Sequence, residues 1–123
     1  MTLNEYFETS NGYGVLATSN EEGQVNIALY AKPHMLDENT LAFIMRNRRS
    51  YGNLQTNPTA AYLYIEKDGG YLGKRLHLTK IREDKDQDAI DTIRRKQRTH
   101  TGPDSDSTLV VFQIDEIRPA VGG

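Results

Sequence analysis

The sequence predicts an α+β, mostly β fold in which six antiparallel strands curl into a small barrel and two or three short helices cover its ends. Three observations lead to this prediction. Six short runs are rich in aliphatic and aromatic residues, turn-forming residues separate these runs, and only short stretches show a helical period. The 123 residues suffice for one domain, and no repeat or interdomain linker divides them.

The first third of the chain predicts one helix and two strands. Thr2 and Glu5 have the spacing of a capping box, in which each side chain bonds the other residue's backbone at a helix start. Apolar residues follow at helical spacing, so we expect a short helix that ends near Asn11. Strands are expected over 13–19 and 24–31, joined by the turn sequence Asn-Glu-Glu-Gly.

The middle of the chain predicts two strands separated by a helix. The run over 40–46 reads as a strand because it is short, apolar and preceded by turn residues. A helix is expected over 48–57, with Ser50 near its N-cap and an Asn-Pro pair as its stop. The next strand is expected over 59–66.

The last third predicts two strands that flank a helix and a loop. The strands are expected over 71–82 and 108–117, and a polar loop over 101–107. The helix is expected over 84–98, because acids gather at its start and bases at its end, as the helix dipole favours. It should cover a sheet edge rather than nucleate the core, because its apolar stripe is thin: Ala89, Ile90 and Ile93.

The composition excludes several classes of protein. The chain has no cysteine, which excludes disulfides, iron–sulfur clusters, thiolate zinc sites and a cysteine nucleophile. A net charge of −2 shows no general bias toward nucleic acid. No apolar run is long enough for a membrane span and the start does not resemble a signal peptide, so we expect a soluble cytoplasmic protein. No metal site is expected, because the three histidines are scattered: His34, His77 and His100.

A run of arginines is the clearest candidate for a binding site. Arg46, Arg48 and Arg49 lie between an expected strand and the helix that begins around Ser50. Arginines repel one another unless solvent or an anion screens them, and a helix start offers unpaired N–H groups and partial positive charge. Forked guanidinium groups suit a phosphate. The alternative is a solvated basic turn.

The second expected strand has two different faces. Val25, Ile27, Leu29 and Ala31 form an apolar stripe, because side chains alternate along a strand. The opposite face combines one small residue with two that form hydrogen bonds, and such a face suits a flat heteroaromatic ring. The alternative is that this second face meets solvent, as one face of an antiparallel sheet often does. The residues of this face are Asn26, Ala28 and Tyr30.

The segment 13–58 resembles the FMN-binding split-barrel family, which includes pyridoxamine-5′-phosphate oxidase and small bacterial FMN-binding proteins. The order of motifs matches: YGVLATS, VNIALY, LAFIMRN and then RRSYGNLQTNPTAAY. The last motif is the most specific. Its matching features are Arg49-Ser50, Asn53-Leu54, Asn57-Pro58 and the small residues Thr59-Ala60-Ala61.

The resemblance implies a single FMN-binding split-barrel domain over residues 1–123. Arg49 and Ser50 match the pair that binds the FMN phosphate, with Arg46 and Arg48 as helpers. Three residues of the second strand match the stretch that borders the isoalloxazine ring. Two residues of the third strand match the strand end beside the ribityl chain. They are Ala28, Leu29 and Tyr30 for the ring, and Ile44 and Met45 for the ribityl chain.

The resemblance also implies a homodimer with the cofactor at the subunit interface, so the partner chain should complete the site. Lys74, Arg75 and His77 are candidates for that contribution. The chemistry would be the flavin's own, as an oxidoreductase or electron carrier with a small-molecule or protein redox partner, and no catalytic residue is assigned. The substrate-binding C-terminal segment of pyridoxamine-phosphate oxidases is not matched. Two alternatives remain: a barrel that binds nucleic acid through arginines and tyrosines, or a barrel of this fold that binds haem or a deazaflavin.

Overall fold

The computed structural model describes residues 1–97 and 107–122. The predicted loop over 101–107 therefore lies outside the described residues except for Ser107. Over the described residues, no helix is long and apolar enough to cross a membrane. The elements, in chain order, are α1 (Leu3–Thr9), β1 (Gly12–Ser19), β2 (Val25–Leu29), β3 (His34–Met35), β4 (Thr40–Met45), α2 (Arg49–Thr56), β5 (Thr59–Glu66), β6 (Gly73–Asp84), α3 (Gln87–Gln97) and β7 (Thr108–Pro119).

The strands form one antiparallel sheet in the order β2-β1-β5-β6-β7-β4-β3. The described sheet has seven strands and is open, so the prediction of six strands in a barrel is wrong on both counts. The additional strand is β3, in which His34 pairs with Ala42 and Met35 pairs with Leu41. Two residues are too few to show the alternation by which strands are recognised in a sequence.

Although the sheet is open, it curls around one core. Tyr30, just beyond β2 at one edge, packs edge-on against Phe43 of β4 near the other edge, with 5.5 Å between ring centroids. Phe43 also lies 5.0 Å from the ring of Tyr62 in the middle of the sheet. Aromatic contacts therefore bridge the two ends of the curl, where backbone pairing stops.

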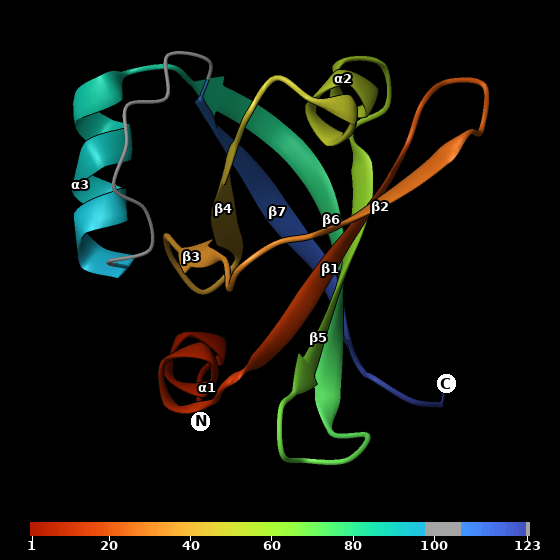
Figure 1. Ribbon diagram of the computed structural model, residues 1–123, viewed down its shortest axis with the longest axis vertical. Helices are drawn as coiled ribbons and strands as arrows, with labels where there is room; N and C mark the ends of the chain where they lie inside the picture. The colour runs from red at the N-terminus through yellow and green to blue at the C-terminus, as the bar shows by residue number, and fades with distance from the viewer. Residues whose placement is uncertain (98–106, 123) are drawn as a thin grey trace.

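Helices cover the ends and one side of this curl (Figure 1). Helix α1 begins with the predicted capping box, since the Glu5 amide donates to Thr2 Oγ1 over 3.1 Å, and its Phe7 is buried in the core. Helix α2 lies at the opposite end. Helix α3 packs on the outside of β4 and β7, where Ile90 is fully buried. The helix covers the sheet, but it lies on the face of β4 and β7 and not over an edge strand as predicted.

Strand β2 presents its apolar side chains outward. Val25, Ile27 and Leu29 are 72%, 68% and 77% exposed, whereas Asn26 and Ala28 are partly buried. The predicted alternation is therefore present, but the mixed face turns inward and the apolar face meets solvent. Strand pairing places β1 and β5 residues beside the stripe. We refer to the whole set as the outer apolar face: Tyr13, Val15, Val25, Ile27, Leu29 and Ile65.

Candidate functional site

The start of α2 is built by a short connection from β4. Residues 46–48 link Met45 to Arg49, and Arg48 is the N-cap residue with extended backbone. The Gly52 amide donates to the Arg48 carbonyl over 2.9 Å. The earlier amides of a helix have no partner within it, so the first turn of α2 presents N–H groups at its open end. Ser50, which was predicted to lie near the N-cap, is the second residue of the helix.

Three arginines lie in the segment that leads into this helix start. Arg46, Arg48 and Arg49 are all exposed, and the Arg48 amide donates to the Arg46 carbonyl over 2.7 Å, which tightens the turn that carries them. Three guanidinium groups within four residues, next to the positive end of a helix dipole, produce a concentrated positive potential. The three arginines therefore lie in an exposed turn at the start of α2.

Ser50 joins this cluster to the inward face of β2. Its side chain is only 3% exposed, and its Oγ accepts a hydrogen bond from Asn26 Nδ2 over 3.2 Å. The Tyr30 hydroxyl also lies beside Ser50. Burial raises the pKa of Tyr30 above its ordinary value, and Ser50 lowers it by only part of that rise, as a hydrogen-bond donor does. The inward face of β2 and the start of α2 are more than twenty residues apart in sequence, and they meet at the Ser50 hydroxyl group.

Helix α2 is held in place by a second buried contact. Asn53 Nδ2 donates to Thr18 Oγ1 of β1 over 3.0 Å, and both side chains are more than nine-tenths buried. Because the contact lies one turn beyond Ser50, it fixes the rotation of α2 about its own axis. The direction in which the helix start points is thereby set by β1.

A third anchor of α2 was not predicted from the sequence. Tyr51 Oη and Gln55 Nε2 donate to the Glu83 carboxylate over 2.6 and 2.8 Å, and Lys80 forms an ion pair with the same group. Burial by itself raises the pKa of Glu83, but these partners outweigh it and lower the pKa to about 2. Glu83 is about thirty residues from its α2 partners in sequence. No local pattern could have indicated the contact.

The structure distributes the other predicted site residues differently. Ala28 lies on the inward face of β2 beside Asn26, whereas the side chain of Leu29 is on the outer apolar face. Met45 is fully buried in the main core, and Ile44 packs toward the α3 side of the sheet. The side chains of Ala28 and Met45 lie on the inner side of the curl with Tyr30, Ala28 on the inward face of β2 and Met45 in the main core against which Tyr30 packs. The side chains of Leu29 and Ile44 point to the other side of the sheet, so these two border the region only through their backbone.

The candidates for the contribution of a partner chain lie elsewhere. Lys74 Nζ sits 4.7 Å from the ring centroid of Tyr6 in α1, at the end of the sheet opposite α2 (Figure 1). The guanidinium of Arg75 donates to backbone carbonyls near the C-terminus. His77 Nε2 is buried with no hydrogen-bond partner among the residues that the structure describes. Within one chain, these three residues therefore lie away from Ser50, Asn26, Tyr30 and the arginines, which we call the Ser50 cluster.

Solved structures with the same fold were found by comparison, although no protein-family model and no curated protein matches the sequence. An FMN-binding protein from Syntrophomonas wolfei superimposes with a TM-score of 0.78 at 19% identity, over 95% of this chain and 82% of that one. HupZ of Group A Streptococcus has a TM-score of 0.75 at 16% identity, over 97% and 94%.

An F420 reductase superimposes with a TM-score of 0.70 at 24% identity, over 93% of this chain and 94% of that one. The structural neighbours are FMN-binding split-barrel proteins, pyridoxamine 5′-phosphate oxidase-like and F420 reductase-like. At these identities the comparison establishes the fold. The expected α+β fold with a mostly antiparallel sheet is therefore confirmed, and it matches the fold of these split-barrel proteins.

Proposed function

We propose, with the split-barrel fold as the premise, that this chain binds FMN at the start of α2. The observation that carries the proposal is the meeting of Asn26 and Tyr30 with Ser50 beneath the exposed arginines. A dianionic phosphate suits a helix start that has three exposed arginines next to it in the chain. An adjoining strand face with one small residue offers the flavin ring a flat surface.

The hydrogen bonds of Ser50 fit this role. A serine hydroxyl has two acceptor lone pairs and one proton to donate. Asn26 donates to one lone pair of Ser50 Oγ, which leaves the serine proton to be donated to Tyr30 in the ligand-free chain and to an anion once one is bound. Because Ser50 is nearly buried, its orientation would be fixed before a ligand arrives, which reduces the entropy cost of binding.

Gly52 supports the same location. A Cβ added at this position would meet no atom within 4 Å, so packing within the chain does not require glycine there. Glycine inside a helix costs about 0.5–1 kcal/mol relative to alanine. We propose that the open space beside Gly52 admits part of the ligand or of the partner chain.

The roles of the remaining residues follow from where they lie. Arg49 and Ser50 would hold the phosphate, with Arg46 and Arg48 beside them. Ala28 and Tyr30 would border the ring with their side chains and Leu29 with its backbone. Ile44 and Met45 would line the ribityl chain through their backbone, because their side chains are directed into the two apolar clusters.

Bound flavin would supply the redox chemistry, by accepting a hydride or single electrons, and the protein would set its potential and its access. We propose an oxidoreductase or electron-transfer role and assign no general acid or base among the described residues. The contribution of the chain is then binding and orientation.

We also propose that the chain works as a homodimer through the outer apolar face. Three neighbouring aliphatic side chains of β2 are each more than two-thirds exposed, and Tyr13 of β1 is 60% exposed. Contiguous apolar surface of this kind is typical of an interface between subunits. His77 and Arg75, on the neighbouring strand β6, would then be available to a site shared with the second chain.

The absorption spectrum of the purified protein tests the cofactor. Flavin bands near roughly 375 and 450 nm, retained through gel filtration with added FMN, are the expected result. A deazaflavin or haem spectrum would instead support the alternative cofactors that this fold suggested. A protein that stays colourless after incubation with FMN would contradict the proposal.

A further inference from the structure

We propose that a trough between α1 and β3 binds an amphiphilic organic cation, at a site separate from the start of α2. Two adjoining cavities form it, with volumes of about 420 and 540 Å³. They share Asn4, Met35 and Leu36 in their walls, so they lie next to one another along the side of α1. Cavities of this size hold small organic ligands.

The walls of the trough are mainly apolar. Phe7 and Leu3 contribute from α1, and Met35 and Leu36 contribute from the segment around β3. Leu36 is 41% exposed, so a large aliphatic side chain faces the open trough without a partner in the core. Methionine adapts its shape to different ligands, which suits a wall that must fit an alkyl or aryl group.

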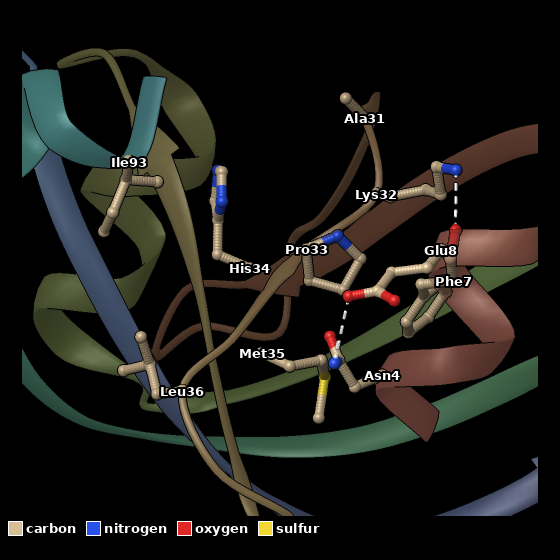
Figure 2. Close-up of a pocket in the computed structure, with 10 residues that line it drawn as sticks. All are labelled: Asn4, Phe7, Glu8, Ala31, Lys32, Pro33, His34, Met35, Leu36 and Ile93. Carbon is tan, nitrogen blue, oxygen red and sulfur yellow. Dashed lines mark hydrogen bonds between the residues drawn. The ribbon is translucent and has the colours of Figure 1, made fainter. Parts of the chain in front are cut away.

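Three carboxylates stand among the polar groups of the rim. Glu8 lies at the mouth of the smaller cavity, and Figure 2 shows its carboxylate directed inward beside Asn4. Asn4 Nδ2 donates to Glu8 Oε1 over 3.1 Å and holds the carboxylate in this position. Asp37 and Glu38 stand at the rim of the larger cavity. Negative charge is therefore present at both ends of the trough.

One ammonium group also lines the smaller cavity, but it is already occupied. Lys32 Nζ donates to the carbonyls of Phe7 and Ser10 over 2.6 and 2.8 Å, at the C-terminal end of α1. Figure 2 shows this nitrogen turned away from the centre of the cavity toward the helix. An anionic ligand would have to compete with two backbone carbonyls for it, whereas a cation meets the Glu8 carboxylate directly.

The ligand that matches these walls has an apolar body of several carbons and one positive charge, as in an alkyl- or arylamine. The apolar body would lie against Phe7 and Leu36, and the ammonium group would pair with Glu8. This inference does not depend on the flavin site. No described residue of the Ser50 cluster lines either cavity.

The test uses three probes with the same chain and different heads: octylammonium, octanoate and octanol. Each is titrated below its micelle concentration into the full-length protein, and backbone amide shifts are followed by ¹H–¹⁵N NMR. We expect octylammonium to bind about tenfold tighter than octanoate, with octanol between them. The largest shifts should occur at Phe7, His34 and Leu36.

Two variants and one control assign the effect. Glu8→Gln keeps the size of the side chain and should bring the affinities for octylammonium and octanoate to within about twofold of one another. Leu36→Ser should lower the affinity for all three probes by a similar factor. Glu21→Gln removes an equivalent exposed carboxylate from the turn between β1 and β2 and should leave the affinities for all three probes unchanged.

Three results would overturn the proposal. One is equal or tighter binding of octanoate by the unaltered protein. Another is a Glu8→Gln variant that keeps its preference for the cation. The third is the absence of saturable shifts in the residues of the trough with any probe at millimolar concentration. Each is independent of whether the same sample binds FMN.

Discussion

The hydroxyl group of Tyr62 fills the space left by the missing side chain of Gly14, where an added Cβ would lie 1.8 Å from Tyr62 Oη. From this position the hydroxyl donates to the carbonyl oxygens of Tyr30 and Ala31, each over 3.1 Å. The Gly14 carbonyl in turn accepts the Tyr30 amide over 2.9 Å. Gly14 and Tyr62 together fix the end of β2, where the candidate flavin face meets the α1 trough.

We expect Gly14→Ala to lower the free energy of unfolding by about 3 kcal/mol, because the new methyl group displaces the Tyr62 hydroxyl and breaks its two hydrogen bonds. Urea unfolding followed by circular dichroism measures the change. Tyr62→Phe, which only removes the hydroxyl, should cost about 1 kcal/mol. A Gly14→Ala variant as stable as the parent would show that β1 and Tyr62 can separate without penalty.

We expect Gly52→Ala to raise the free energy of unfolding of the ligand-free protein by about 0.5–1 kcal/mol, since the added methyl group meets no atom and alanine favours a helix. The same variant should bind FMN more weakly if ligand or partner chain occupies that space. Thermal unfolding with and without FMN separates the two effects. A stabilised variant with unchanged FMN affinity would remove Gly52 from the proposed site.

The free energy of unfolding should fall at acidic pH because Glu83 becomes protonated. The folded pKa is about 2, below the ordinary 4.5, so the folded state favours the carboxylate. The contribution is complete above about pH 4.5 and is lost as the pH falls toward 2, by up to about 3 kcal/mol. Urea midpoints measured between pH 2 and 6 test this.

Glu83→Gln is the matched variant for that titration. It removes the titrating group and the ion pair with Lys80, yet a glutamine oxygen can still accept from Tyr51. The variant should be less stable than the parent at pH 6, and the difference should shrink as the pH approaches 2. If both proteins lose stability in parallel, other carboxylates dominate the acid response.

Arg49 should distinguish FMN from riboflavin, which has the same ring without the phosphate. We expect a preference for FMN of about 10- to 1000-fold, from charge-assisted hydrogen bonds at the helix start. Arg49→Ala should remove much of this preference and leave riboflavin affinity nearly unchanged. Fluorescence titration of both ligands measures it, with Lys67→Ala, an exposed charge in the β5–β6 turn, as the control. Equal affinities in the unaltered protein would favour a solvated basic turn.

Ile27→Glu should separate the proposed dimer into chains of 13.9 kDa, because it places a charge in the middle of the outer apolar face. Sedimentation velocity at micromolar concentration should show about twice that mass for the parent. Leu36→Glu introduces the same charge at an exposed leucine outside this face and should leave the mass unchanged. A monomeric parent would contradict the proposed assembly.

The sequence predicted most of the helices and strands because their signals are local. The run over 59–66 begins after an Asn-Pro pair and alternates to its end, and β5 has these same bounds. The capping box of Thr2 and Glu5 is also a matter of a few neighbouring residues. Strand β3 escaped prediction because its two residues form a strand only by pairing with β4.

Which face of β2 points into the core could not be predicted from such local signals. Alternation in β2 separates two faces but does not state which one meets the core. Apolar side chains ordinarily face inward, yet here the neighbours of Asn26 and Tyr30 on α2 decide the direction. Contacts between distant segments, such as Tyr51 with Glu83, exist only once the sheet has curled and therefore leave no trace in the local pattern.

The position of β2 at the edge of the sheet also bears on the fate of damaged protein. Residues 24–31 contain no charge and no proline, and only one side of β2 is paired, which are the features of segments that form cross-β aggregates. Charged gatekeepers stand on both sides, Glu21 and Glu22 before the strand and Lys32 after it. Substitutions that loosen β2 should therefore deplete the protein in cells by precipitation before they unfold it, and neutralising the gatekeepers should aggravate that loss.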